Sequence, residues 1–228
     1  MSKPVYVNGT EIFEKYKARL LDYKVDSPSI TDSYLEMKHS IVPVKLKESV
    51  GTRKITLELE FKGDTCNDSL MNISDLTAEF LQETELQLPD GFDYFCVLNK
   101  AAAPVLEGDT FYSVKFTLVG YRHLPVESKV FTETDSLEAS GNVEAPVIIT
   151  IEDAYGTVTV NDITVKNIDG TVVINGYDKT VMALTDGVFV NKFKDCTMTK
   201  FPTVKPGFNL ISITGSATVT IEYTPVLL

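Results

Sequence analysis

The stretch that decides the fold is FPTVKPGFNLISITGSATVTIEYTPVLL, residues 201–228. Four apolar residues alternate with polar ones in its last part: Ala217, Val219, Ile221 and Tyr223. A period of two is typical of a half-buried antiparallel strand. Pro206-Gly207 predicts a turn before the preceding strand, because proline fixes φ and glycine tolerates a positive φ. With a further turn at Thr214-Gly215, the chain is expected to end in two joined strands at the edge of a β-sandwich.

The same pattern extends back to Gly141. Short apolar runs recur at 147–149, 158–160, 163–165, 172–174 and 188–190. Polar turn pairs separate them, namely Asn161-Asp162, Asp169-Gly170 and Asn175-Gly176. This spacing, rich in β-branched residues, predicts about eight short strands that form an antiparallel sandwich over residues 141–228.

Residues 1–135 predict an α+β domain built on an antiparallel sheet. Residues 5–7, before Asn8-Gly9, predict a short strand and a turn. Further strands are expected at 18–25, 54–61, 94–98 and 111–119. From about 68 to 83 the period becomes helical, with Asp68 or Ser69 as the N-cap and an apolar face of Ile73, Leu76, Thr77 and Phe80. The chain as a whole is therefore predicted to be mainly β.

Two segments lack periodicity. Residues 26–51 contain Pro28, Pro43 and scattered charges, and such a long irregular excursion predicts an extended arm. Residues 121–140 contain Pro125 and several carboxylates, which predicts a linker between the domains 1–135 and 141–228.

Charge and cysteine usage exclude several classes. The chain has 32 acidic and 21 basic side chains, a net charge of −11, and no Lys/Arg run, which disfavours a nucleic-acid interface. Cys66, Cys96 and Cys196 form no CxxC pair, which indicates synthesis in a reducing cytosol. No signal-peptide core and no apolar run near the ~20 residues of a membrane span occur, so we expect neither export nor membrane insertion.

The potentially reactive residues have structural explanations. His39 and His123 lack HExxH spacing. Cys96 lies in the apolar run 94–98, where a buried, inert thiol is expected. Glu58 and Glu60 lie two apart on one strand face, as at a solvated edge, whereas a glycosidase needs carboxylates facing each other across a cleft.

Four aspartates are regularly spaced in a way that could suggest calcium: Asp162, Asp169, Asp178 and Asp186. They lie beside Asn or Gly at predicted turns, where aspartate is favoured for local hydrogen bonds. We therefore predict no catalytic, cofactor-binding or metal-binding residue, and no enzymatic activity.

The order of these pieces resembles the siphophage distal tail protein family. The C-terminal motifs that carry the resemblance are Gly141-Asn142, Pro146 with its β run, Asn161, Ile168-Asp169-Gly170, Val173-Ile174, Phe201-Pro202, Pro206-Gly207-Phe208-Asn209 and Tyr223-Thr224-Pro225. The N-terminal half is similar in its order of elements: Asn8-Gly9, an arm, a strand, one helix and a long strand. One departure is Val226-Leu227-Leu228 after the final proline, where many members have an aromatic residue.

The resemblance implies a structural virion protein with a galectin-like C-terminal sandwich. It implies a homohexameric ring at the tail tip that joins the tail tube protein to the baseplate hub and supports host-adsorption components, including a receptor-binding protein. The arm would reach the neighbouring subunit, and DNA would only pass through the channel, which we hypothesise to be acidic. Synthesis would take place in the cytoplasm of the bacterial host.

The alternative is a carbohydrate-binding β-sandwich module without catalytic activity. Such a module needs an exposed aromatic platform for stacking on sugar faces. The chain has no Trp, and its C-terminal aromatic residues mostly fall at predicted strand positions: Tyr155, Tyr177, Phe189, Phe193, Phe201, Phe208 and Tyr223.

Overall fold

The structure, a computed structural model, describes residues 4–35, 44–185 and 187–228. It is mainly β, as predicted. The chain divides into two compact units, Met1–Arg122 with Leu228, and His123–Leu227. Each unit has its own buried apolar cluster, so each buries a core of its own.

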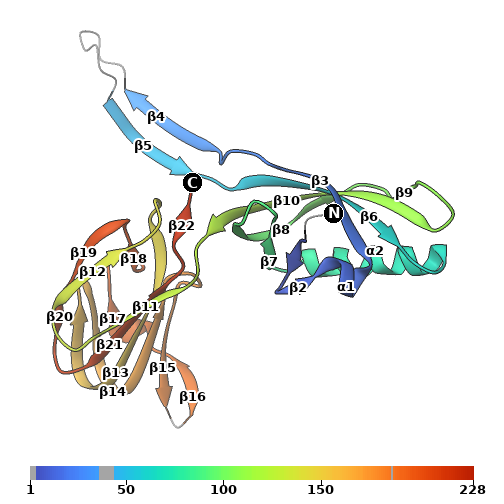
Figure 1. Cartoon of the computed structure of the whole chain (residues 1–228). Helices are drawn as coiled ribbons and strands as arrows, with labels where there is room; N and C mark the ends of the chain where they lie inside the picture. The colour runs from blue at the N-terminus through green and yellow to red at the C-terminus, as the bar shows by residue number, and fades with distance from the viewer. Residues whose placement is uncertain (1–3, 36–43, 186) are drawn as a thin grey trace. The chain divides into compact units, whose positions relative to one another are not determined.

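The first unit is a sheet with a helix on one face (Figure 1). Its elements are β1 (Tyr6–Val7), β2 (Thr10–Glu11), α1 (Ile12–Tyr16), β3 (Ala18–Val25), β4 (Ile30–Leu35), β5 (Val44–Val50), β6 (Arg53–Lys62), α2 (Cys66–Phe80), β7 (Thr84–Gln87), β8 (Asp93–Ala101), β9 (Val105–Leu106) and β10 (Phe111–His123). The main sheet has the strand order β2-β1-β7-β8-β10-β6-β3, and β9 pairs with β10.

Helix α2 packs on the apolar face of this sheet. The alternation of β6 is confirmed, since four of its side chains are completely buried: Ile55, Leu57, Leu59 and Phe61. Ile73, Leu76 and Phe80 of α2 are buried in the same cluster. The rings of Phe80 and Phe116 meet edge to face with their centroids 5.5 Å apart. The single long helix predicted from the sequence therefore closes the core of this unit.

The start of α2 differs from the prediction. The N-cap is Thr65, not Asp68 or Ser69. The backbone N–H of Asp68 donates to Thr65 Oγ1 at 3.2 Å, and the Thr65 N–H donates to Asp68 Oδ2 at 2.9 Å. This reciprocal capping box satisfies two amide groups that the first helical turn leaves without partners.

The predicted N-terminal strand and its turn at Asn8-Gly9 are confirmed, and the turn is that of a hairpin. Asn8 and Gly9 have φ of 50° and 75° and connect β1 to β2. Positive φ at both central residues is the geometry of the tightest hairpin turns. The short helix α1, which the sequence pattern did not predict, follows directly and ends at Tyr16, with Lys17 as its C-cap at a φ of 51°.

Residues 26–51 were expected to be an irregular arm, but the described part is a β-hairpin. β4 and β5 pair antiparallel and form a two-stranded sheet. The Gly51 N–H donates to the Ser29 carbonyl at 2.7 Å, so the pairing continues from β3 and β6 into the hairpin. The backbone groups of an isolated segment need partners, and pairing the two halves of the arm supplies them.

The second unit is a β-sandwich. Its elements are β11 (Glu127–Phe131), β12 (Asp135–Ala139), β13 (Ala145–Val160), β14 (Ile163–Asn175), β15 (Thr180–Thr185), β16 (Val188–Asn191), a 3-10 turn (Phe193–Asp195), β17 (Cys196–Thr197), β18 (Thr203–Val204), β19 (Gly207–Ile211), β20 (Ile213–Thr214), β21 (Thr218–Tyr223) and β22 (Val226–Leu227). The main sheet has the order β11-β21-β13-β14-β15-β16, while β12 and β19 form a separate pair.

Two long strands replace several of the predicted short ones. β13 and β14 pair along most of their length, with register shifts between Ile151 and Ala154 and between Gly156 and Val158. Asp153 and Gly156 have positive φ inside β13, as Gly170 does inside β14. The predicted turns at Asn161-Asp162 and at Gly176 are confirmed, since they connect β13 to β14 and β14 to β15. Asp169-Gly170, by contrast, lies inside β14 next to a register shift, and such a bulge bends a strand without ending it.

The prediction that residues 121–140 form a linker is wrong. Residues 127–131 and 135–139 are the strands β11 and β12, which pair with β21 and β19. Phe131, Leu137 and Ala139 are buried in the sandwich core. The boundary between the units therefore falls at His123, because this segment contributes to the second core.

The closing strands pair differently from the prediction. The alternation of β21 is confirmed, with Ile221 only 2% exposed. However, β21 lies between β11 and β13 instead of at an edge, and β19 pairs with β12. Gly207 has a φ of 85°, as a turn after Pro206 requires.

Candidate interaction surfaces

The three cysteines lie in separate places as free thiols. Cys96 is buried under the first sheet, and burial raises its pKa to about 12. Cys66 is exposed, and its Sγ lies 3.0 Å from the Asp109 carbonyl. The predicted burial of Cys96 is thus confirmed, and the raised pKa disfavours the thiolate, which is the reactive form of cysteine.

The carboxylates Glu58 and Glu60 lie in cross-strand ion pairs. Glu58 Oε2 is 3.2 Å from Lys115 Nζ, and Glu60 Oε2 is 2.9 Å from Arg19 Nη2. All four side chains project from β3, β6 and β10 on the face opposite the buried side chains of β6. This face is charged but balanced in sign at these pairs, which suits contact with water or a polar partner.

The aspartates make local hydrogen bonds. Asp162 accepts from Thr199 Oγ1 at 2.8 Å, and Asp178 accepts from Asn175 Nδ2 at 2.9 Å. Asp169 lies within β14, opposite Tyr155. Among the described residues, no group of three or more His, Cys, Asp or Glu side chains could hold a metal ion. Asp186 and His39 lie outside the described residues, and His123 is buried.

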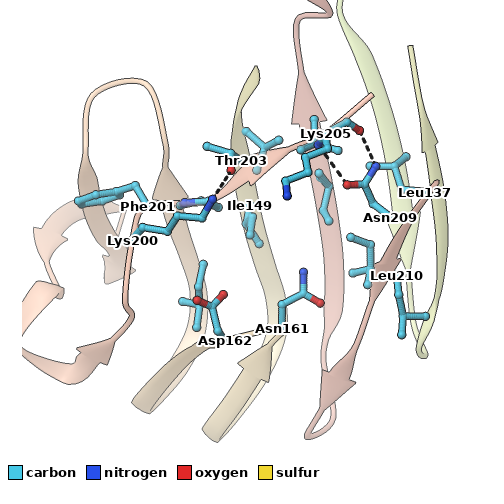
Figure 2. Close-up of a pocket in the computed structure, with 16 residues that line it drawn as sticks. Leu137, Ile149, Asn161, Asp162, Lys200, Phe201, Thr203, Lys205, Asn209 and Leu210 are labelled. Atoms are coloured by element: carbon cyan, nitrogen blue, oxygen red, sulfur yellow. Dashed lines mark hydrogen bonds between the residues drawn. The ribbon is translucent and has the colours of Figure 1, made fainter. Parts of the chain in front are cut away.

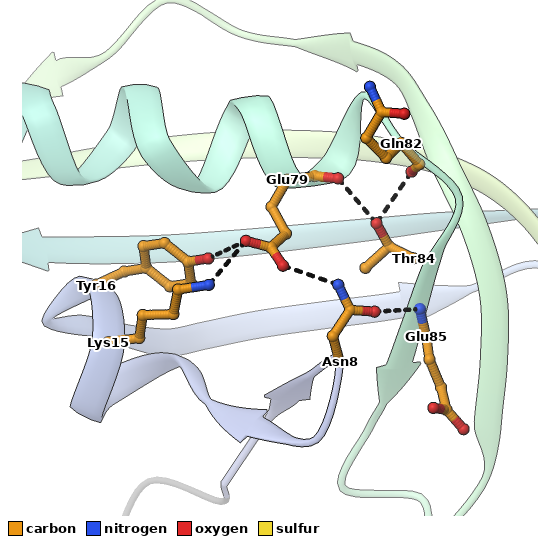
Figure 3. Close-up of polar contacts among 7 residues, drawn as sticks. All are labelled: Asn8, Lys15, Tyr16, Glu79, Gln82, Thr84 and Glu85. Carbon is orange, nitrogen blue, oxygen red and sulfur yellow. Dashed lines mark hydrogen bonds and ion pairs between the residues drawn. The ribbon is translucent and has the colours of Figure 1, made fainter.

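Glu79 is the centre of a polar cluster that joins three segments of the first unit (Figure 3). Its carboxylate accepts hydrogen bonds from Asn8 Nδ2 at 2.8 Å, Lys15 Nζ at 2.9 Å and Tyr16 Oη at 2.5 Å. The Asn8 side chain also accepts from the Glu85 N–H at 3.0 Å. These donors, Tyr16 first, lower the pKa of Glu79 to about 2. The cluster fixes α2 to α1 and to the first hairpin, a structural task.

The β15–β16 hairpin presents an apolar edge to solvent. Val188 and Phe189 are 62% and 57% exposed, and Val190 is exposed as well. β16 is the last strand of the sheet, so its outer backbone edge has no neighbouring strand within the described residues. Apolar edge strands promote association between chains, and natural proteins normally cover or charge them.

The C-terminal aromatic residues are more exposed than their strand positions predicted. Tyr155 and Phe208 are each 75% exposed, and Phe193 stacks on Phe201 with the ring centroids 6.1 Å apart. Only Tyr223 among the seven is buried, with its hydroxyl hydrogen-bonded to Glu127. Strand position alone does not give the direction of a side chain when bulges change the register.

A cavity of about 170 Å³ opens between the layers of the second unit (Figure 2). Its floor consists of branched aliphatic side chains, Val147, Ile149, Ile163, Ile211 and Ile221. Polar side chains surround it: Asn161, Asp162, Lys200, Thr203, Lys205 and Asn209. The sequence pattern did not predict this cavity, because strands far apart in the chain supply its walls.

Within the described residues, no helix combines the length and the apolar character that a membrane crossing requires.

Comparison with known proteins gives similarity in structure only. No protein-family profile matches the sequence, and no curated protein matches it either. The structure of the Dit protein of phage SPP1, described as a paradigm of the hub adsorption apparatus in phages that infect Gram-positive bacteria, aligns with a TM-score of 0.69 and 14% identity over 99% of both chains.

Two structures of the phage p2 baseplate in its activated conformation, with Sr and with Ca, also align. Their TM-scores are 0.53 and 0.52, at 14% and 15% identity, over 90% of both chains. The resemblance to distal tail proteins is thus confirmed at the level of the fold. Over nearly its whole length, the chain has the fold of the SPP1 Dit protein.

Proposed function

We propose that the chain is a structural protein of a siphophage tail tip. In this proposal, six copies form a ring that joins the tail tube protein to the baseplate hub. The observation that carries the proposal is the alignment with SPP1 Dit over 99% of both chains, which includes both units in one order. An alignment over a single sandwich would support only a shared module.

The β4–β5 hairpin supports assembly with sister copies. Its two strands pair only with each other among the described strands. An isolated two-stranded hairpin is marginally stable in water, so contact with a second chain would stabilise it. Cyclic assemblies need such head-to-tail contacts, in which one patch meets a different patch on the neighbour. We therefore assign the hairpin as the clasp between neighbouring subunits.

The second unit would carry the adsorption components of the tail tip. Its β15–β16 hairpin combines exposed Val188, Phe189 and Val190 with a strand edge. Exposed apolar patches of this kind mark protein interaction sites. A receptor-binding protein or another baseplate protein would cover this edge in the virion.

DNA would meet the ring only as it passes through the channel. The net charge of −11 disfavours retention of a polyanion. The proposal involves no catalysis, and the polar clusters of Glu58, Glu60 and Glu79 are explained by structural ion pairs and hydrogen bonds. The protein would be made in the bacterial cytoplasm and act in the virion.

A carbohydrate-binding module is the second candidate. The exposed rings of Tyr155 and Phe208 favour it, since aromatic faces stack on sugars. The full-length match in fold and the hairpin favour the ring, because a module that binds sugar as a monomer needs neither.

Negative-stain electron microscopy of the purified chain tests the proposal. We expect closed rings with six-fold symmetry, either from the chain alone or after addition of the tail tube and hub proteins from the same phage. Isolated particles in both preparations, together with retention of the protein on a glycan column, would support the carbohydrate-binding module instead.

A further inference from the structure

The cavity of the second unit has the features of a peptide-anchoring site. Its volume, about 170 Å³, is close to that of an apolar cavity of ~150 Å³ that holds a benzene molecule. The floor side chains Val147, Ile149 and Ile221 are each no more than 3% exposed. One phenylalanine or leucine side chain from another molecule would therefore fit and find hydrocarbon on most sides.

A sugar suits this floor poorly. Branched aliphatic groups offer no hydrogen bonds, and burying hydroxyl groups without partners is costly. The exposed ring of Phe208 does not line the cavity, and Phe201 already stacks on Phe193. The floor selects an apolar group.

The rim adds a charge preference. Figure 2 shows Lys200 and Lys205 at one end of the cavity, with Asn161 and Asp162 at the other. Lys200 Nζ lies 3.0 Å from Glu144 Oε1. The Thr203 hydroxyl, then Lys200 and more weakly the charge of Lys205 lower the pKa of Glu144. Among the described residues, Lys205 has no carboxylate within ion-pair distance. At the lysine end of the cavity, opposite Asp162, two ammonium groups near the single carboxylate of Glu144 leave room for a second anion.

The backbone of Lys205 is held in place before any ligand arrives. Its N–H donates to Asn209 Oδ1 at 3.1 Å, and its carbonyl accepts from Asn209 Nδ2 at 2.7 Å. The turn between them contains Gly207 at a φ of 85°. A backbone that is already held at this part of the rim lowers the conformational entropy lost on binding.

We propose that this cavity binds an extended segment of a partner polypeptide through one aromatic or leucine side chain, with an adjacent Asp or Glu of that segment placed against Lys205. Such an anchor in a pocket, surrounded by a polar rim, is the usual form of a binding hot spot. The site lies wholly within the second unit and does not require the ring, so its failure and that of the ring proposal can be distinguished.

Three short peptides test the proposal by methyl NMR on the full chain: acetyl-Asp-Phe-Asp-amide, its isosteric Asn-Phe-Asn form and its Asp-Ala-Asp form. The first should shift the methyl signals of Ile149 and Ile221 but not those of Ile55 in the first unit. Replacing both aspartates by asparagine should weaken binding about threefold, the scale of an exposed ion pair. The alanine form should produce no saturable shift.

Two charge variants complete the test. Lys205→Glu should weaken the binding of the Asp-Phe-Asp peptide, so that it no longer binds more tightly than the Asn-Phe-Asn peptide. Lys166→Glu, at an exposed lysine that does not line the cavity, should change neither the affinity for the Asp-Phe-Asp peptide nor the difference in affinity between the two peptides. Equal shifts from all three peptides, unshifted Ile149 and Ile221 signals, or stronger shifts from glucose or glucuronate at the same concentration would overturn the proposal.

Discussion

Ile30 lies opposite Val50 in the first residue pair of the β4–β5 ladder. The two strands of the hairpin are therefore already paired at Ile30 and Val50. The part of the hairpin beyond this pair can be removed without interrupting the main sheet. Because of this register, the proposed contact between subunits can be tested by shortening the hairpin.

The first prediction concerns assembly. Replacing residues 31–49 by Asn-Gly, which suits a two-residue hairpin turn, should leave a folded monomer that no longer forms rings. Light scattering gives the mass, and circular dichroism checks the fold. A variant with Phe189→Thr, far from the hairpin in sequence, serves as the control and should still assemble. Rings of unchanged size from the shortened chain would show that the hairpin is not the clasp.

The second prediction concerns the core of the sandwich. Ile221→Asp should unfold the second unit, because an unpaired charge at a 2% exposed position costs several kcal/mol. Limited proteolysis should then degrade residues 123–227 and spare the first unit. Glu222→Gln, at the exposed neighbouring position, should change protease resistance little. Equal resistance of both variants would contradict the described direction of Ile221.

The third prediction concerns pH. The pKa of Glu79 is lower in the folded chain than in the unfolded chain, so its contribution to stability is complete above about pH 4.5 and is lost as the pH falls toward about 2. Glu79→Gln should lower the stability of the first unit at pH 7 by about 1–2 kcal/mol, after allowance for solvent screening. The stability of this variant should also change less with pH between pH 4.5 and 2 than the stability of the unmodified chain.

Hydrogen exchange of the α2 amides measures both effects. Glu83→Gln, at an exposed position just beyond α2, is the matched control and should behave like the unmodified chain. An unchanged acid profile in Glu79→Gln would mean that the cluster does not stabilise the fold.

The fourth prediction concerns the apolar edge. Changing Val188, Phe189 and Val190 together to threonine should shift the free energy of unfolding by about 0.5 kcal/mol or less per residue, because exposed positions tolerate substitution. The triple variant should also bind less of an apolar fluorescent dye than the unmodified chain, because its exposed apolar surface is smaller. Ile149→Thr, at a buried position, should by contrast destabilise the sandwich strongly. A large loss of stability in the triple variant would show that this edge belongs to the core.

The sequence predicted the elements with a regular apolar period, although Leu21 of β3 and Leu70 and Met71 of α2 are exposed. Strand β3 has the predicted bounds, and β6 and α2 differ by only a few residues at their ends. In β6 and along the buried face of α2, the period in the sequence equals the period in the structure, whereas β3 has a register shift between Leu20 and Asp22.

The failures have a common physical cause in bulges and short strands. Asn167 and Asp153 have positive φ inside strands, and the same residue types mark turns, so the sequence could not distinguish a bend from an end. In β11 the pattern is reversed: Val130 is exposed, while Lys129 lies on the same face of the strand as the buried Phe131 and donates to Asp135 and the Ser136 carbonyl. Because β11 has only five residues and one apolar and one polar residue occupy unexpected faces, its sequence shows no alternation from which a strand could be predicted.

The candidate surfaces were the least predictable feature. The cavity depends on residues from 137 to 221 that pairing brings together, and nothing in their spacing indicates this. The capping box of α2, by contrast, was readable as Thr65 followed three residues later by Asp68.

The mass of the purified chain in solution tests the central claim most directly. Native mass spectrometry over a range of concentrations, with and without the tail tube and hub proteins, should find a species of six times 25.2 kDa. A mass of 25.2 kDa at every concentration and in every mixture would contradict the account.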